Sequence, residues 1–463
     1  MKFLFLLNSA PYISEYFGSL CDLLAKLQHE IIIYVNSEYS KKYYLKYYPK
    51  EAKIYERNKM NLKKIFIDNH FLWKNFYESW DRKKGQKIFN DYSYVKTIIE
   101  KTYSDIREII EREKPDYIVH EPPANVLSET AFFLSKEFNI KYLGFIQSRI
   151  PGRIDVYDEK YTHSSLTRDN LNKIRINSED KDYFVRFNNG FLSHELKPDY
   201  LQAPGNKIHN MSLVKYYIKK INRIPTYAYL NKTIKKNNFI WDYETLYVLK
   251  FQSIRNNLSR KVHKNNYKKY IDEVTSLSNK DYFVFPLHLQ PEASTSGQAT
   301  YFSDLLSTIK YIAFSLPYPN VLAVKEHPSA LGTRSRSFYK ELKKIPNVIF
   351  LDPHVNNEEL IEKSKGVITL TSTLGLEAAL KGKLVLILGE VFYNFHPNCV
   401  KVKFYDEISD IIKKEKPISG ENELENINSK FWKMYKDISI EGTVFQPMTE
   451  KAGSELFKLL KES

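Results

Sequence analysis

The sequence predicts an α/β protein built from two doubly wound, Rossmann-like domains. Short apolar runs alternate with segments of helical periodicity in two series, one starting at Lys2 and the other at Tyr282. Strands that are apolar throughout are typical of parallel sheets buried on both faces, and strand–helix alternation builds such sheets. The chain of 463 residues also exceeds one ordinary domain of about 150 residues.

The first series opens with an apolar strand at 2–8, followed by a helix with leucines at helical spacing and the strand EIIIYV at 30–35. Residues 40–100 are rich in Tyr, Lys and Trp, and we expect helices outside the sheet there, including an amphipathic stretch at 66–80. The later elements are a helix stop and strand at 114–121, a helix at 126–138 and a strand at 140–145. We place the first domain at residues 1–154.

Residues 155–277 separate the two series as a polar, basic and Asn-rich connector, partly helical and partly belonging to the first lobe. Its densest cluster of charge is RKVHK at 260–264. Such a run usually forms a solvated face. The alternative is contact with lipid phosphate or with an anionic acceptor.

The second series occupies residues 278–429. Strands and helices are expected alternately at 282–286, 301–314, 321–325, 338–343, 348–351, 358–363, 367–370, 374–380 and 384–388. This repetition predicts a second doubly wound sheet. The last segment, 430–463, is helical in character, and we expect it to pack back across both lobes.

The charge balance is basic, because 70 Lys and Arg against 55 Asp and Glu leave a net charge of +15. Nucleic acid, an anionic membrane face or an anionic substrate would each suit this charge. Biased codon usage explains it equally well, since the chain is rich in Lys, Asn, Ile and Tyr.

The cysteines and the apolar runs indicate the compartment. Cys21 and Cys399 are far apart, which argues against structural zinc and fits a reducing environment. The apolar run after Met1 is about five residues long, shorter than a signal-peptide core of about 7–15. Since no run of about 18 apolar residues predicts a membrane span, we expect a cytoplasmic protein, peripheral at most to the inner membrane face.

The most informative motif is Lys325-Glu326-His327-Pro328, at the end of the strand 321–325. Side chains alternate along a strand, so Lys325 and His327 share one face and Glu326 lies on the other. Ligands of open α/β sheets bind at the carboxyl ends of strands. We therefore expect two cationic donors for a phosphate leaving group, whose charge grows as its bond breaks. The alternative is a histidine that only caps the strand.

A second motif, TSTLGLEAA at 371–379, leads from a strand through hydroxyl residues into a helix. Helix N-termini offer free N–H groups to anions, and Ser372 and Thr373 add hydroxyl donors. Ordinary N-capping is the alternative. Glu377 lies four residues after Thr373 and therefore fits a capping box poorly. It suits ribose hydroxyls as well as it suits a first-turn acid.

Two loops complete the candidate site. The loop LHLQPEASTSG at 287–297 is polar, with Gln290, Glu292 and Ser294 as candidate ligand contacts, and it matches neither a dinucleotide nor an ATP fingerprint. His120-Glu121-Pro122-Pro123 ends a strand of the first domain. Glu121 is a candidate general base or nucleophile there. Its alternative is a solvated residue in a proline-stiffened turn.

Taken together, these motifs resemble the capsule polysaccharide biosynthesis family, which includes the Kdo transferases that start bacterial capsule chains. The matching stretch is roughly Phe283 to Gly389: FPLHLQPEAS, VKEHPSALGTRS, IPNVIFLDP, NNEELIEKS and TLTSTLGLEAALKGKLVLILG. The Lys-x-His-Pro and Ser-Thr pieces are also similar to those of bacterial sialyltransferases, which use CMP donors.

The resemblance implies a glycosyltransferase of the GT-B type, with the donor nucleotide in the second domain and the acceptor in the first. It implies that Lys325 lies near the base or phosphate, that His327, Ser372 and Thr373 bind the donor phosphate, and that Glu358 holds the ribose, with Glu359 nearly as good. His327 is also assigned to catalysis, with Glu121. GT-B enzymes generally need no bound metal, and no cofactor is expected.

The favoured reaction therefore moves a CMP-activated acidic sugar, such as Kdo or sialic acid, to a surface polysaccharide or glycolipid. Transfer from a UDP- or GDP-sugar is the rival within this class. A sugar-nucleotide epimerase on the same fold would act on the donor alone. A non-catalytic nucleic-acid-binding protein is suggested only by the net charge, and it leaves the motifs unexplained.

Overall fold

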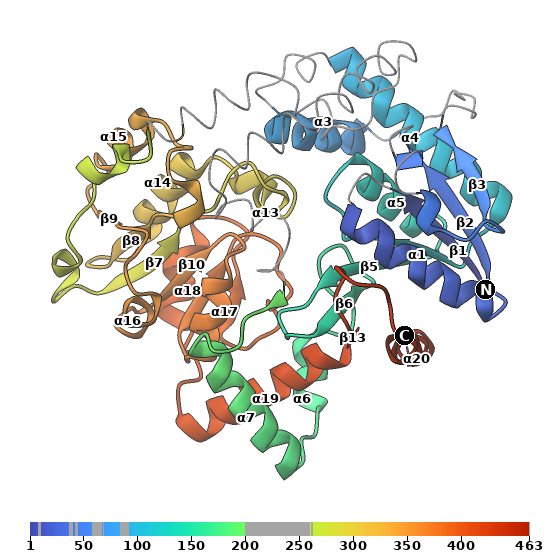
Figure 1. Cartoon of the computed structure of the whole chain (residues 1–463). Helices are drawn as coiled ribbons and strands as arrows, with labels where there is room; N and C mark the ends of the chain where they lie inside the picture. The colour runs from blue at the N-terminus through green and yellow to red at the C-terminus, as the bar shows by residue number, and fades with distance from the viewer. Residues whose placement is uncertain are drawn as a thin grey trace, which may run out of the picture. The chain divides into compact units, whose positions relative to one another are not determined.

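The computed structural model describes residues 1–7, 11–36, 40–41, 45–57, 67, 69–83, 92–199, 260 and 263–462. About half of the predicted connector, residues 200–259, lies outside the described residues. The chain forms two compact units, coloured by residue number in Figure 1. Among the described residues, the first unit contains Met1–Ser164 and the chain from Lys436 onward. The second unit contains Ser165–Glu195 and the chain from Arg260 to Tyr435.

The first unit contains a seven-stranded sheet in the order β13-β6-β5-β4-β1-β2-β3. Its strands are β1 (Lys2–Leu7), β2 (Glu30–Val35), β3 (Lys53–Glu56), β4 (Tyr117–His120), β5 (Lys141–Gln147), β6 (Arg153–Tyr157) and β13 (Ser439–Glu441). The strands from β3 to β5 in this order pair in parallel, whereas β6 and β13 are antiparallel additions at the edge. The order 3-2-1-4-5 of the parallel part is that of a Rossmann-type sheet.

Helices cover both faces of this sheet because the central strands β1 and β2 are apolar on both faces. They are α1 (Pro11–Lys26), α3 (Asn69–Lys83), α4 (Tyr92–Glu113), α5 (Val126–Glu137) and α20 (Glu450–Glu462). Phe3 and Phe5 of β1 pack in one core cluster with residues of α1 and α20. Leu4 and Leu6 pack in the other with residues of α3, α4 and α5.

The second unit contains a six-stranded, wholly parallel sheet in the order β12-β11-β10-β7-β8-β9. Its strands are β7 (Tyr282–Pro286), β8 (Val321–Lys325), β9 (Val348–Leu351), β10 (Gly366–Thr369), β11 (Leu384–Ile387) and β12 (Cys399–Lys401). In chain order this is 3-2-1-4-5-6, the doubly wound order of dinucleotide-binding domains. Successive strands are added on one side of β7 up to β9 and then on its other side from β10 to β12. The position between β7 and β10 is therefore the switch point of the sheet.

The helices of this unit are α6 (Arg168–Lys173), α7 (Ser178–Leu192), α13 (Ala293–Ser296), α14 (Leu305–Ser315), α15 (Arg336–Leu342), α16 (Asn357–Glu362), α17 (Thr373–Leu380), α18 (Glu407–Lys414) and α19 (Glu421–Asp437). Residues of α14, α15 and α18 share a core cluster with Phe283 and Phe285 of β7. Helix α17 packs against β10 and β11. Short 3₁₀ turns occur at Leu45–Tyr47, Asn266–Lys269, Val274–Leu277, Thr300–Phe302 and Pro328–Ala330.

Two Rossmann-like sheets are therefore present, as the sequence predicts, but the units divide the chain differently from the predicted domains. Ser165–Glu195 belongs to the second unit because α7 packs on α19, with Phe187 and Phe191 against Trp432 at ring-centroid distances of 4.8 and 5.0 Å. The chain from Lys436 belongs to the first unit because β13 pairs with β6. The cleft predicted between the domains stays a prediction.

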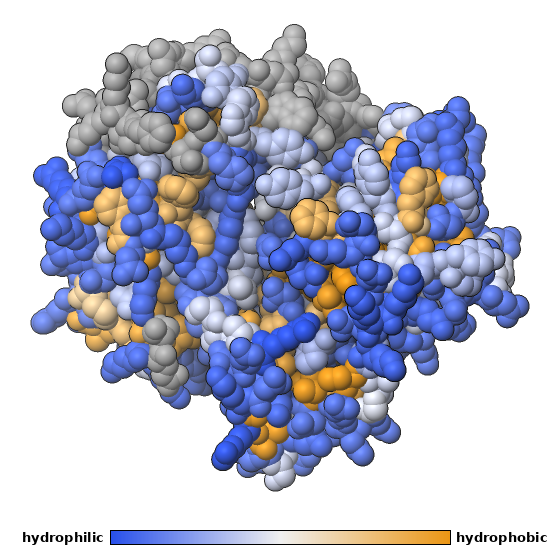
Figure 2. All heavy atoms as spheres, turned by 180° about the vertical axis from the view of Figure 1, so that it is seen from behind, coloured by the Kyte–Doolittle hydropathy of each residue, from blue (hydrophilic) through white to orange (hydrophobic). Residues whose placement is uncertain are grey.

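Among the described residues, no helix is long and apolar enough to cross a membrane. The face of the molecule in Figure 2 is mostly hydrophilic, with smaller hydrophobic areas between the polar side chains.

Candidate functional site

The loops that follow β7 and β10 meet at the switch point of the second sheet. The Thr371 backbone N–H donates to Nε2 of His288 at 3.1 Å, and the Thr371 hydroxyl donates to the Ser294 carbonyl at 3.2 Å. The structure thus brings together the polar loop 287–297 and the hydroxyl-rich turn 371–373, which the sequence singled out separately. Ligands of doubly wound sheets bind at this position.

Ser372 is the N-cap of α17, and its hydroxyl oxygen accepts from the Leu374 N–H at 3.2 Å. Thr373 is the first helical residue. The Ser372 N–H donates to the Thr369 hydroxyl at 3.0 Å, which fixes the turn before the helix. The capping alternative is thus real: it uses the Leu374 N–H, and the Gly375 N–H donates to the Ser372 carbonyl at 3.1 Å. The Ser372 hydroxyl proton and the Thr373 N–H remain as the donors that this turn offers to an anion.

Tyr393 stabilises this turn through a hydrogen bond. Its hydroxyl donates to the Ser372 carbonyl at 2.5 Å. Gly375 makes the approach possible, because a Cβ at this position would lie 2.6 Å from the Tyr393 hydroxyl oxygen.

His327 follows β8 and is half-buried. Its Nδ1 accepts from the Ser329 N–H at 3.1 Å, so the neutral ring carries its proton on Nε2. Burial lowers the pKa of His327, and the nearby Arg334 and Lys325 lower it further against the opposing effect of Glu326. The ring therefore favours the neutral form, unlike the cationic donor that the sequence predicts, but it still presents an N–H donor.

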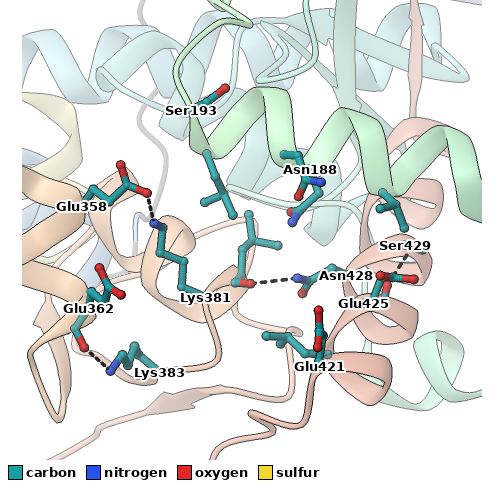
Figure 3. Close-up of a pocket in the computed structure, with 15 residues that line it drawn as sticks. Asn188, Ser193, Glu358, Glu362, Lys381, Lys383, Glu421, Glu425, Asn428 and Ser429 are labelled. Atoms are coloured by element: carbon teal, nitrogen blue, oxygen red, sulfur yellow. Dashed lines mark hydrogen bonds and ion pairs between the residues drawn. The ribbon is translucent and has the colours of Figure 1, made fainter.

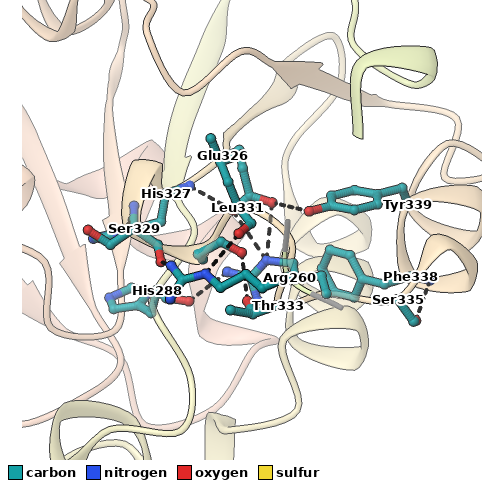
Figure 4. A network of polar contacts seen from close by, with 12 residues as sticks. Arg260, His288, Glu326, His327, Ser329, Leu331, Thr333, Ser335, Phe338 and Tyr339 are labelled. Atoms are coloured by element: carbon teal, nitrogen blue, oxygen red, sulfur yellow. Dashed lines mark hydrogen bonds and ion pairs between the residues drawn. The ribbon is translucent and has the colours of Figure 1, made fainter. Parts of the chain in front are cut away.

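A buried network anchors the backbone at His327 (Figure 4). Glu326 accepts from the His327 N–H at 2.6 Å, from the Tyr339 hydroxyl at 2.8 Å and from Arg334 Nε at 3.2 Å. Arg334 also donates to the His288 carbonyl at 2.6 Å. Glu326 contacts α15 while Lys325 contacts α16, which agrees with the predicted alternation of faces.

Arg260 also holds the loop that follows β8. It donates to the carbonyls of Ser329 and Leu331, the latter at 3.1 Å. The sequence interpretation of cluster 260–264 as a solvated face is therefore wrong for Arg260, because these carbonyls draw its guanidinium into a half-buried position. Lys261 and Val262 lie outside the described residues.

Lys325, at the end of β8, is buried and donates through Nζ to Oδ1 of Asn357, the first residue of α16. Burial lowers its pKa, and the charges of Glu377 and Asp352 oppose this shift. Burial raises the pKa of Glu377, against the charges of His194, Lys325 and Lys381. The site thus combines a desolvated cation and a desolvated carboxyl, a combination common where ligands bind.

Glu358, predicted to hold a ribose, lies in the first turn of α16 and forms an ion pair with Lys381 at 2.5 Å. This pair lowers the pKa of Glu358. Both residues line a cavity of about 580 Å³ bounded by α7, α16 and α19 (Figure 3). Lys325, His327 and Ser372 are not among the residues that line it, but Glu358 is close enough to Glu377 to help raise the pKa of that carboxyl.

Two of the residues predicted to contact a ligand, Gln290 and Ser294, form hydrogen bonds to nearby residues of the chain. Gln290 donates to the Ser303 carbonyl at 2.5 Å, and the Ser294 hydroxyl donates to the Glu292 carboxylate at 3.1 Å. Glu292 is exposed. These three residues shape the loop that meets Thr371.

Glu121, the predicted catalytic carboxylate, directly follows β4 in the first unit and is partly buried. Its carbonyl accepts from the Tyr142 hydroxyl at 2.6 Å. The preceding His120 is fully buried, neither ring nitrogen has a hydrogen-bond partner, and burial lowers its pKa to about 3. β4 adjoins β1 at the switch point of the first sheet, so this motif has the position that the sequence predicts.

Sequence reasoning missed His288, Arg334 and Asn357. His288 lies within the quoted loop and Arg334 within LGTRS, but their roles depend on contacts between separate strands, which one sequence does not reveal. Among the described residues, no group of three or more His, Cys, Asp or Glu side chains is placed to hold a metal ion.

Comparison with known proteins identifies the region that contains this site. Residues 202–397 match the family described as capsule polysaccharide biosynthesis protein. The resemblance to this family is confirmed. The match includes β7 to β11 and both motifs at the switch point, and it extends over residues 202–259, which lie outside the described residues. No curated protein matches the chain.

Similar solved structures include a beta Kdo 2,7 transferase, KpsC, from Thermosulfurimonas dismutans, with 13% identity, a TM-score of 0.32, and 77% of this chain and 89% of that chain covered. A UDP-GlcNAc 2-epimerase from Neisseria meningitidis bound to UDP-GlcNAc has 13% identity, a TM-score of 0.25 and full coverage of both chains. A glycosyltransferase from Rickettsia africae has 11% identity, a TM-score of 0.25, and 100% and 98% covered. These similarities are too distant to support a conclusion about this chain.

Proposed function

We propose that this protein is a glycosyltransferase that takes a sugar from a nucleotide donor for the synthesis of a surface polysaccharide or glycolipid. The observation that carries the proposal is the meeting of the β7 and β10 loops at the switch point, beside the His327 N–H donor and Lys325. Together with the family match over residues 202–397, this arrangement supports a donor site in the second unit.

The chemistry of the site suits a departing nucleotide phosphate. Negative charge grows on the phosphate oxygens as the glycosidic bond breaks, and preorganised donors stabilise that charge. Nε2–H of His327, the hydroxyl of Ser372 and the N–H of Thr373 at the start of α17 are such donors. Lys325 supplies a positive charge in a partly dry environment, where an ionic interaction is stronger than in water.

A CMP-activated acidic sugar is the favoured donor, because the site and the net charge of +15 both suit anions. Glu121 is the proposed base on the acceptor side. We propose a reaction without metal or other cofactor, a glycan or glycolipid acceptor, and a cytoplasmic protein in peripheral contact with an anionic membrane face. Nucleic acid is not a proposed partner.

Thermal unfolding with nucleotides tests the proposal. A ligand at 100 times its dissociation constant adds about 2.7 kcal/mol of stability, so CMP should raise the melting temperature visibly. His327→Ala should abolish the shift, because it removes the Nε2–H donor. His354→Ala is the matched control: it removes an exposed histidine after β9 and should keep the shift.

The other nucleotides discriminate among the alternatives. A shift with UDP or GDP but not CMP would replace the acidic-sugar donor by a neutral-sugar donor or point to an epimerase, which turns over the donor without acceptor. Absence of a shift with all three nucleotides would contradict a donor site in the second unit.

A further inference from the structure

His288 connects three loops of the candidate site. It follows β7 and is only 6% exposed. Its ring accepts the Thr371 N–H from the loop after β10, at 3.1 Å, while its carbonyl accepts Arg334 from the loop after β8, at 2.6 Å. Figure 4 shows His288 on the same side of the polar network as His327, with Tyr339 on the opposite side.

The Thr371 contact determines the tautomer of His288. A neutral imidazole that accepts at Nε2 carries its proton on Nδ1. Burial lowers the pKa of His288 to about 3, and the nearby His327 and Arg334 act in the same direction. Because the ring stays neutral, its Nε2 remains an acceptor for Thr371 throughout the neutral pH range.

The contact also determines the orientation of the next residue, Ser372. Thr371 is tied to the β7 loop twice, through its N–H to His288 and through its hydroxyl to the Ser294 carbonyl. The Tyr393 hydroxyl donates to the Ser372 carbonyl and so holds the following peptide. Loss of the His288 acceptor would leave the Thr371 N–H unpaired, with the same peptide still held at its Leu370 carbonyl by the Gly389 N–H at 3.0 Å. The hydroxyl and helix N-terminus that follow would then be held less firmly in alignment.

We propose that His288 is a positioning residue for the phosphate-binding turn: through Nε2 it holds Thr371 so that Ser372 and the N-terminus of α17 face the phosphate of the donor nucleotide. This inference rests on the proposed function. His288 itself needs no contact with the nucleotide, in keeping with its burial.

Two substitutions test the hydrogen-bond acceptor at Nε2 separately from the rest of the imidazole ring. His288→Gln retains an amide oxygen that reaches the position of Nε2. His288→Asn has a shorter amide that reaches only the position of Nδ1 and cannot accept from Thr371. Binding of CMP and of cytidine, measured by calorimetry on the full chain, isolates the contribution of the phosphate.

We expect His288→Asn to weaken CMP binding on the order of tenfold, as for the loss of one well-placed hydrogen bond, and to leave cytidine binding unchanged. His288→Gln should recover most of the CMP affinity. Equal losses in both variants, or no loss in either, would overturn the inference, because the acceptor at Nε2 would then not matter. If the wild type prefers UDP, the same comparison is made with UDP and uridine.

The ring proton gives an independent test that needs no ligand. In a ¹⁵N spectrum of the wild-type histidine side chains, assigned with His288→Gln, the inference requires the Nδ1–H tautomer for His288. An Nε2–H tautomer would overturn the inference and leave the proposed function intact. Failure of the wild type to bind CMP, UDP or GDP would instead overturn both.

Discussion

At the scale of single residues, hydrogen bonds to backbone N–H groups determine what the two histidines of the site can do. Ser329 donates to Nδ1 of His327, whereas Thr371 donates to Nε2 of His288. The first ring is left with an Nε2–H donor and the second with an Nδ1–H. Neutral imidazoles of opposite tautomer thus lie beside the same turn, one suited to contact a phosphate and the other to hold the backbone.

Glu326 gives the clearest stability prediction at this scale. Glu326→Gln should destabilise the second unit by about 3–5 kcal/mol, because it leaves Arg334 buried without a carboxylate partner. The side chains of Arg334 and Glu326 are 7% and 0% exposed. Urea unfolding measures the difference in free energy.

Glu359→Gln is the matched control for Glu326→Gln. It breaks an ion pair with Lys363 in which both side chains are more than half exposed, at 58% and 66%. Surface pairs contribute about 1 kcal/mol or less. Similar losses in the two variants would contradict the view that the Glu326 network is the buried anchor of the His327 loop.

The sequence predicts the position of Lys325 and His327 because strand alternation is a local property. It does not reveal that burial lowers the pKa of His327, because desolvation depends on residues packed around the ring. Arg260 is misread for the same reason: its partners, the carbonyls of Ser329 and Leu331, are far away in the chain. Local pattern thus identifies the group, and tertiary packing determines its chemical state.

At the scale of elements, predictions succeed where a strand is apolar throughout. Strands β2, β7, β8 and β9 have the expected bounds, because each is a short apolar run with clear turns beside it. The strands that the sequence does not predict are β3, β6, β12 and β13. They are short edge or next-to-edge strands, with polar residues, and their pairing depends on partners distant in sequence. The β13–β6 pair joins residues 439–441 to 153–155.

The close approach behind the phosphate-binding turn predicts the effect of Gly375→Ala. Alanine favours a helix over glycine by about 1 kcal/mol, but its Cβ would lie 2.6 Å from the Tyr393 hydroxyl and 3.0 Å from Thr369 Cγ2. We expect a net loss of about 1–3 kcal/mol, as for other overpacked sites, together with weaker nucleotide binding. Thermal unfolding and calorimetry measure the two effects.

Tyr393→Phe in the Gly375→Ala background tests the cause, because it removes the hydroxyl with which the Cβ collides. The double variant should be more stable than additivity of the single variants predicts. Gly420→Ala is the control, since nothing lies within 4 Å of a Cβ at that position, and it should be near neutral. Additive effects of the Gly375 and Tyr393 substitutions would show that this contact is not the constraint.

At the scale of the whole molecule, buried neutral histidines link stability to pH. Burial lowers the pKa of His120 and His288 to about 3 and that of His396 to about 4. In the unfolded chain a histidine has a pKa of about 6.5. Between these values the unfolded state binds more protons than the folded state, so stability falls as the pH decreases from about 6.5 towards 4. Each such histidine contributes a slope of about 1.4 kcal/mol per pH unit.

His396 allows this linkage to be measured away from the candidate site. Its ring is buried against Phe431, Nδ1 accepts from the Asn398 N–H at 3.2 Å, and Nε2 pairs with Asn428 at 3.1 Å. His396→Gln removes the titrating group, so the dependence of unfolding free energy on pH between 6 and 4.5 should become shallower by about 1 kcal/mol per unit. The variant will lose stability at pH 7 through poorer packing, but the slope reports only the proton. His354→Gln replaces an exposed histidine in the same way and is the control for the substitution itself. If urea titrations across this range give parallel lines for wild type and His396→Gln, the carboxylates account for acid sensitivity and the buried histidines do not.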